Sequence, residues 1–568
     1  MKRTPQPWVG LALAASLLLS GCATGWRAAW RPATGAAKQA DFERREQALE
    51  QRARAHAHYA AGVAYDLNGQ GEAAEKEFWA SVWADPANEP LALELTRRLL
   101  QRQRADRAAE LLTRCAALPG ASGLVHAWLA LAQAQSGRLD PAIASARAAI
   151  KKAPQLALGY QTLTQIYLDK KQPQEALKVM DEALRQPAAP AEFLVDVAET
   201  IAGAARNKTV ALEEAKPRVQ AALSRAAQHK PAQPLLLQKM AESYKTIGDL
   251  ARAAELYQQL LKEHPPANPA LLPVLREQLL QLYLRSGDKA RAAEQLREIV
   301  RDNPGNAQAH YLLGNLAAEA KQYDEAASAL TKVLLFNPDF EPAYYELAGV
   351  QLMNNQPQEA LDTLNKARAR FQVGFLLEYY AGLAHAALKQ YAEAVKNYIS
   401  AEVHAKTSEP TRLNHIFYFQ LGAACERRSD YAEAEKQFRK CLQLSPDYAE
   451  ALNYLGYMWA ERGVNLEEAR TMIEKAVKLE PKNAAYLDSL GWVLFKLKRT
   501  EEALGYQEQA MALAEKPDPT LYDHLGDIYA ALGRINEARA AWQKALALEP
   551  TEELKKKLAE HAPSAPSP

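Results

Sequence analysis

The sequence predicts an all-α fold, a right-handed solenoid of about fourteen helix–turn–helix units. The first observation is an alanine that recurs every 34 residues in two sets. These alanines are Ala74, Ala108, Ala142 and Ala176, then Ala292, Ala326, Ala360 and Ala394. The second is a fixed set of aromatic, small and proline residues that accompanies them. The third is that the repeat runs from roughly residue 55 to 552, which leaves no space for another kind of domain.

Each residue type in the repeated set has a physical role. The clearest copy is Tyr522, Leu525, Gly526, Tyr529, Ala538, Trp542, Ala545 and Pro550. Gly526, Ala538 and Ala545 are small, so the two helices of one hairpin can approach closely. Larger residues such as Trp542 fill the space between neighbouring hairpins, where close packing favours bulk. Pro550 lacks an amide donor and therefore ends the second helix.

This set resembles the tetratricopeptide repeat family, whose units are helical hairpins that stack on copies of themselves. The first copy is His58, Gly62, Tyr65, Ala74, Phe78 and Pro86. A middle copy is His310, Leu313, Gly314, Ala326, Leu330, Val333 and Pro338, and a later one is Tyr418, Leu421, Gly422, Ala434, Phe438, Cys441 and Pro446. Extra residues interrupt the period between Ile201 and Val219, where we expect a surface loop.

The N-terminus reads as a secretory signal. Lys2 and Arg3 precede an apolar stretch over residues 8–19, which is too short to span a bilayer, and the sequence LSGC follows. This ending resembles the lipobox of bacterial lipoproteins. The resemblance implies that residues 1–21 are removed and that Cys22 carries the lipid. The alternative is a soluble signal in which the cysteine occurs by chance.

The remaining layout follows from these two features. We expect a flexible tether over 22–40, the repeat array over 41–550, a capping helix over 551–562 and a disordered tail over 563–568. No aspartate follows the lipobox cysteine, and by resemblance to sorted lipoproteins this favours the outer membrane, facing the periplasm. The inner membrane and the cell surface are the alternatives.

The composition argues against several classes of function. Lys and Arg number 69 against 68 acidic residues, so there is no basic field for nucleic acid. We find no phosphate-binding loop, metal-ligand spacing or nucleophile motif, so we expect no catalytic residues, metal, cofactor or small-molecule substrate. Cys115 and Cys441 occupy an alanine position of the repeat, which indicates packing. Whether Cys425 and Cys441 form a disulfide stays open.

Aromatic residues recur on the first helices of the later repeats. The family's concave groove is lined by the second, fifth, ninth and twelfth positions of the first helix. In this register the later units place seven rings: Tyr311, Tyr345, Tyr379, Phe419, Tyr457, Trp492 and Phe495. We expect the main partner groove at residues 307–500, because rigid rings give a large contact area to an extended peptide. The alternative is that the rings pack the superhelix itself.

The resemblance implies a protein that binds other proteins. Its last three repeats are similar to those of large outer-membrane tetratricopeptide lipoproteins of Gram-negative bacteria. We therefore expect a non-catalytic scaffold, anchored in the membrane by its N-terminal lipid, that holds a protein or extended peptide and raises its local concentration. The alternative is an assembly platform for polysaccharide or protein export. An enzyme is the least favoured class.

Overall fold

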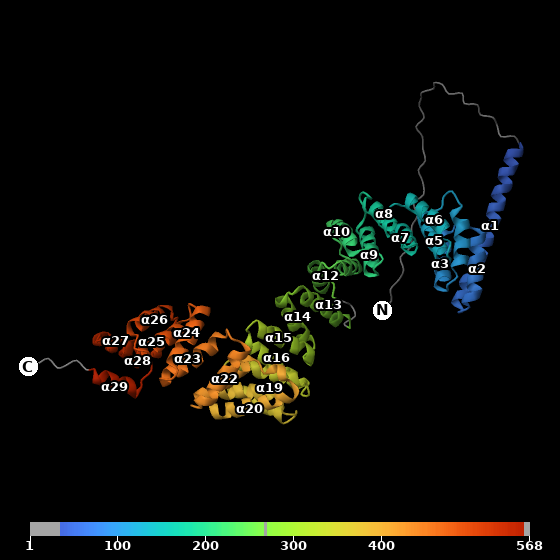
Figure 1. Ribbon diagram of the computed structural model, residues 1–568. Coiled ribbons are helices and arrows are strands. Elements are labelled where there is room, and N and C mark those ends of the chain that lie inside the picture. Colours follow the sequence, from blue (N-terminus) through green and yellow to red (C-terminus); the bar gives the residue numbers. More distant parts are fainter. Residues whose placement is uncertain (1–34, 266–269, 562–568) are drawn as a thin grey trace, which may run out of the picture. The chain divides into compact units, whose positions relative to one another are not determined.

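The computed structural model describes residues 35–265 and 270–561, and the fold is all-α, as the sequence predicts. These residues form 29 α-helices and one short 3-10 helix, with no strand among them (Figure 1). The chain divides into two compact units, residues 1–260 and 261–568. None of the helices in the described part of the chain is long and apolar enough to cross a membrane.

Unit 1 contains six consecutive helical hairpins. Its helices are α1 (Gly35–Leu67), α2 (Gly71–Ala84), α3 (Glu89–Gln101), α4 (Ala105–Ala116), α5 (Gly123–Gln135), α6 (Leu139–Lys152), α7 (Ala157–Asp169), α8 (Pro173–Leu184), α9 (Ala191–Arg206), α10 (Leu212–Gln228), α11 (Pro234–Thr246) and α12 (Leu250–Glu263). The last helix reaches three residues past the division between the units. Each odd-numbered helix is the first helix of its hairpin.

Unit 2 continues the same pattern with eight hairpins and a final helix. Its helices are α13 (Leu271–Ser286), α14 (Lys289–Asp302), α15 (Ala307–Glu319), α16 (Tyr323–Phe336), α17 (Glu341–Met353), α18 (Pro357–Arg368), α19 (Phe375–Ala387), α20 (Tyr391–Ser408), α21 (His415–Arg427), α22 (Tyr431–Leu444), α23 (Ala449–Arg462), α24 (Leu466–Leu479), α25 (Ala484–Lys496), α26 (Thr500–Leu513), α27 (Pro519–Ala531), α28 (Ile535–Leu548) and α29 (Glu552–Glu560). A 3-10 turn, Pro410–Arg412, lies between α20 and α21.

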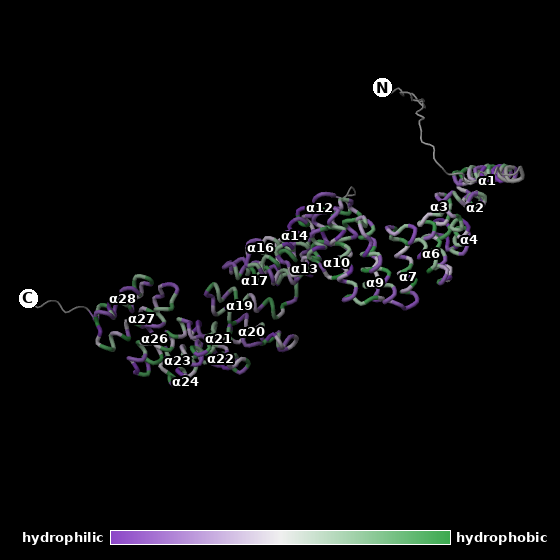
Figure 2. Tube along the Cα trace, turned by 90° about the horizontal axis from the view of Figure 1, so that it is seen from above, coloured by the Kyte–Doolittle hydropathy of each residue, from purple (hydrophilic) through white to green (hydrophobic). Residues whose placement is uncertain are grey.

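Glycine opposite a large residue sets the spacing within the hairpins. A Cβ atom added to Gly62 would lie 2.6 Å from the ring of Phe78, and one added to Gly422 would lie 2.9 Å from Phe438. Only glycine therefore permits this approach, which is the role that the sequence assigns to the small residues. Apolar and polar residues are interspersed along the helices (Figure 2). Second helices such as α24 bury one face, whereas the first helix α25 is buried over the consecutive residues 486–494.

Three features differ from the layout that the sequence suggests. Helix α1 begins at Gly35, inside the segment expected to be a tether. The extra residues after Ile201 lengthen α9 and α10 to 16 and 17 residues instead of forming a long loop, although α9 contains Gly203 and α10 contains Pro217. Alanine, the best helix former, recurs in both helices and favours this outcome. The array also divides into two units close to residues 264–272, a linker that contains Pro265, Pro266 and Pro269, although the sequence alone suggests one continuous array.

The structure describes the predicted features at the two ends of the chain to different extents. The signal segment, the lipidated Cys22 and the tail at 563–568 lie outside the described residues. Helix α29 lies where the capping helix is expected, and its Leu554 is buried against α28. Cys115, Cys425 and Cys441 are free and buried. Burial raises the pKa of the Cys425 thiol to about 11.

Candidate functional site

Three of the seven rings expected in the groove are buried. Tyr345 and Phe419 are 7% exposed and Trp492 is 6% exposed. The Tyr345 hydroxyl donates to Glu341 at 2.6 Å, and the Trp492 indole N–H donates to Glu461. These rings pack against neighbouring helices and leave little area for a partner.

The other four rings, Tyr311, Tyr379, Tyr457 and Phe495, are half-buried. Tyr311 lies edge-on to Phe340, with ring centroids 5.0 Å apart, and its hydroxyl donates to Glu346 at 2.5 Å. Burial, followed by this carboxylate, raises the pKa of Tyr311.

The rings do not form one continuous surface. Tyr379 stacks on Phe375 at 5.4 Å and belongs to a cluster between α19, α20 and α21. Phe419 packs instead on Tyr454 at 5.2 Å, between α21 and α23. Trp492 stacks on His524 at 3.9 Å and on Phe495 at 5.2 Å. The structure therefore brings the rings together in separate groups along unit 2, and their role in binding a partner stays a prediction.

A cleft of about 480 Å³ crosses the first helices of four successive hairpins in unit 2. Its walls come from α21, α23, α25 and the start of α27, with Tyr431 of α22 at one side. We call it the α21–α27 cleft. Of the seven predicted rings only Tyr457 lines it. The rest of the lining includes Glu426, Arg427, Asn453, Tyr454, Glu461, Arg462, Asp488, Ser489, Asp518 and Thr520.

Carboxylates converge on the Tyr457 hydroxyl inside this cleft. Glu461, Asp488 and Glu426 are all close enough to act on its charge. Burial, followed by these carboxylates, raises the pKa of Tyr457 above its usual range, so the phenol stays neutral. Burial also raises the pKa of Glu426, although the neighbouring Arg427 partly opposes the shift.

A buried polar network supports one wall of the cleft. Asp488 accepts hydrogen bonds from His524 at 2.9 Å and from Gln507 at 2.6 Å. Gln507 lies opposite Gly491, where most hairpins of unit 2 place an apolar side chain, and it is fully buried. Its amide also donates to the Leu521 carbonyl at 3.0 Å. These bonds fix the Asp488 carboxylate at the cleft, because a buried polar group must find partners.

One sequence feature that marks this cleft is the residue type at the fifth position of each first helix. The fifth position of the first helix lies three residues before its small residue, and it holds rings in the four units from Tyr311 to Phe419. In the next three units the same position holds Asn453, Asp488 and Asp523. A change from rings to polar groups at one repeat position was therefore visible. Glu426 and Glu461 carried no such signal, since glutamate is common on exposed helix faces.

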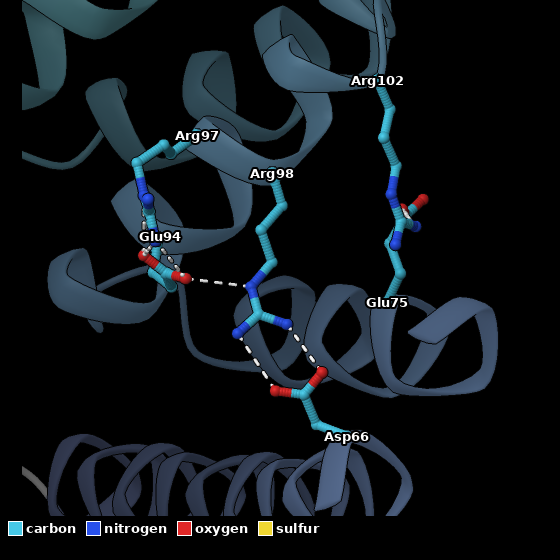
Figure 3. Close-up of polar contacts among 6 residues, drawn as sticks. All are labelled: Asp66, Glu75, Glu94, Arg97, Arg98 and Arg102. Carbon is cyan, nitrogen blue, oxygen red and sulfur yellow. Dashed lines mark hydrogen bonds and ion pairs between the residues drawn. The ribbon is translucent and has the colours of Figure 1, made fainter. Parts of the chain in front are cut away.

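The first two hairpins of unit 1 show a different kind of site. Arg98 of α3 binds Asp66 of α1 through two nitrogens, at 2.9 and 3.1 Å, and also binds Glu94 (Figure 3). Glu75 of α2 is buried and accepts from Arg102 at 2.7 Å. Each carboxylate faces arginine, so this cluster serves as an ionic connection between hairpins.

The described residues offer little for metal chemistry. Within 35–265 and 270–561, no three His, Cys, Asp or Glu side chains are grouped so that they could hold a metal ion. The acidic groups at the α21–α27 cleft instead suit hydrogen-bond donors and cations, and the rings beside them suit apolar or planar groups.

Comparison with known proteins identifies the repeat. Models described as "Tetratricopeptide repeat" match residues 236–267, 278–342, 317–384, 415–448, 483–516 and 519–552. The chain is also similar to the TPR repeat-containing protein PA4667 of Pseudomonas aeruginosa. The two are 34% identical over 156 residues, which is 27% of this chain and 25% of that protein. The chain thus matches about a quarter of the length of this relative.

Solved structures give weaker likenesses. The Cut9–Hcn1 hetero-tetramer of the APC/C has a TM-score of 0.31 at 16% identity, covering 90% of this chain and 96% of that one. YrrB, a TPR protein with an unusual peptide-binding site, has a TM-score of 0.29 at 23% identity, covering 34% of this chain and 97% of its own. All these TM-scores are below 0.5, so nothing about function follows from them.

The matched repeats coincide with helical hairpins over much of unit 2 and, in unit 1, with the last hairpin, α11 and α12. The glycine–aromatic contacts that the repeat requires occur in the first hairpin and again near the C-terminus. Arrays of this kind support a protein–protein interaction scaffold. The chain is a tetratricopeptide repeat protein.

Proposed function

We propose that this protein is a non-catalytic adaptor of the bacterial cell envelope, anchored by a lipid on Cys22, that holds a protein partner against the first helices of unit 2. The observation that carries the proposal is the α21–α27 cleft. Four successive first helices contribute to it, and it offers carboxylates, amides and tyrosines to a partner. An extended segment lying across several repeats would meet all of these groups in turn.

The anchor explains why such a scaffold would be useful. The LSGC sequence at 19–22 supports lipidation, and a multiply acylated cysteine gives stable membrane attachment. A partner bound to an anchored scaffold is confined to a thin layer at the membrane. Its effective concentration there is raised without any new contact between the partner and its own substrate.

Photo-crosslinking in intact cells tests the binding role. A photoreactive residue at Thr520, which is exposed and lines the cleft, should capture a distinct protein. The same residue at Lys478, exposed on the second helix α24, is the control and should not capture it. Equal capture at both positions would contradict a role for the cleft.

Fractionation tests the anchor. Replacing Cys22 with alanine should move the protein, and the partner captured at Thr520, from the membrane fraction to the soluble fraction. If the variant stays in the membrane fraction, the lipid is not what holds the protein there.

A further inference from the structure

The carboxylates of the α21–α27 cleft are poorly matched by cations of the chain itself. Glu461 accepts a hydrogen bond from the Trp492 indole, which is a neutral donor. Across the residues that the structure describes, Glu461 forms no ion pair. Glu426 has only the adjacent Arg427, with the Nε and Oε2 atoms 3.5 Å apart. Both glutamates therefore retain capacity to accept from a cation.

A buried amide in the same cleft also lacks a partner. Asn453 of α23 lines the cleft, and the residue is only 7% exposed. Its Oδ1 atom accepts no hydrogen bond from the described residues. An unpaired buried acceptor is destabilising, because it has lost its hydrogen bonds to water. A donor on a bound molecule would remove this cost.

The net negative charge of the residues that line the cleft favours a positively charged group on the bound molecule. Four acidic residues, Glu426, Glu461, Asp488 and Asp518, line the cleft against two arginines. Of these arginines, Arg427 is already beside Glu426, and Arg462 lies over the Tyr431 ring at 4.6 Å.

We propose that the α21–α27 cleft binds an arginine or lysine side chain from an extended segment of the protein partner. This inference rests on the proposed function and names the chemistry of the partner. Glu426 and Glu461 supply the charge, and the tyrosines of the cleft offer rings that attract a cation. Asn453 accepts a hydrogen bond from the bound segment.

Selection from a random peptide library tests this. Twelve-residue peptides displayed on phage would be selected on the full chain and on the E426Q/E461Q variant. The wild-type chain should enrich arginine or lysine at one position, and the variant should lose this enrichment. The matched control is E467Q/E474Q on α24, which removes the same charge from exposed carboxylates outside the cleft. It should select as the wild type does.

A synthetic form of the most strongly enriched peptide then tests whether the positive charge of its basic residue contributes to binding. Replacing its arginine by citrulline, or its lysine by norleucine, should raise the Kd at least tenfold for the wild-type chain and hardly at all for E426Q/E461Q. Enrichment of acidic or uncharged peptides, enrichment that survives in E426Q/E461Q, or a failure to enrich any motif would overturn the inference. Calorimetric melting of each variant checks that the array stays folded.

The two proposals fail separately. If Thr520 crosslinks a protein in cells while the selected peptides show no basic residue, the adaptor role stands and the preference for a cation is wrong. If the peptides are basic but Thr520 captures nothing in cells, the cleft chemistry stands and the adaptor role is wrong.

Discussion

The first hairpins of unit 1 and the later hairpins of unit 2 follow one repeat but are held together differently. In unit 1, Arg98 joins α3 to Asp66 of α1 through exposed ion pairs (Figure 3). In unit 2, Phe419 of α21 packs on Tyr454 of α23, and Trp459 of α23 is buried in the same cluster. The residues of the repeat pattern produce the same helical hairpin in both regions. The residues at the other positions determine whether neighbouring hairpins contact one another through ion pairs or through aromatic rings. The ion pair between α1 and α3 should respond to pH and salt, and the packing of Phe419 on Tyr454 should not.

The largest effect should come from removing a buried ring of unit 2. Trp459→Ala deletes a fully buried side chain whose indole donates to Glu435 at 3.1 Å, and should destabilise unit 2 by about 3–5 kcal/mol. Trp83→Ala in unit 1 is the matched control. Trp83 is 38% exposed and lies under Arg114, so its loss should cost about 1 kcal/mol or less. Denaturant unfolding followed by hydrogen exchange would measure the loss of stability in both variants. Equal losses would contradict the proposed difference between the two regions.

The glycines that the two regions share should behave alike. Gly62→Ala and Gly422→Ala each place a Cβ against a ring, so both should destabilise by about 1–3 kcal/mol despite alanine's better helix propensity. Gly505→Ala in α26 has open space around it and should stabilise by about 0.5–1 kcal/mol. Thermal melting distinguishes these signs. A stabilising Gly422→Ala would mean that the ring can move aside.

A smaller effect should follow from breaking the ionic connection. Arg98→Ala removes the pair between α1 and α3, and amide exchange in α1 should rise by less than about tenfold, because exposed ion pairs contribute little. The control is Arg97→Ala, whose guanidinium pairs with Glu94 on its own helix. Arg97→Ala should leave amide exchange in α1 unchanged. A rise equal to that of Arg98→Ala would show that the overall charge of this region matters more than the ion pair between α1 and α3.

The smallest effect should be a pH dependence at this connection. Hydrogen bonds from Arg98 lower the pKa of Asp66, and those from Arg98 and Arg97 lower that of Glu94. A lowered folded-state pKa adds stability above the ordinary carboxyl range of 3.8 to 4.5, and this stability is lost as the pH falls through the lowered values. Protonation should therefore loosen α1 in acid, as NMR of its amides would show. No loosening down to pH 2 would contradict it.

The hairpins themselves could be predicted because their determinants are local. The contacts of Gly62 with Phe78 and Gly422 with Phe438 each join residues 16 apart within one hairpin, so the repeat pattern alone places them. The burial of Tyr345 and Trp492 depends on what the neighbouring hairpin places against them, which no single repeat encodes. The same holds for Gln507, whose hydrogen-bond partners, the Asp488 carboxylate and the Leu521 carbonyl, come from α25 and α27.

The cleft was only partly predictable for a related reason. The 307–500 groove and Tyr457 follow from the repeat register, but Glu426 and Glu461 look like ordinary surface residues until α21 and α23 bring them to one cleft. The division near Leu260 was equally hidden. The prolines marked a linker, but whether the helices pack across it depends on tertiary contacts.

Hydrogen exchange of the full chain, alone and bound to the partner captured at Thr520, tests the central claim most directly. If the first helices of unit 2 hold the partner, binding should slow exchange in α23, α25 and the start of α27, while the second helices α24 and α26 change little. Unit 1 has a comparable cleft of about 290 Å³, lined by Gln161 and Gln165 of α7 and Thr200 of α9, which serves as the internal reference. Protection confined to α7 and α9, with none in α23 and α25, would contradict the account.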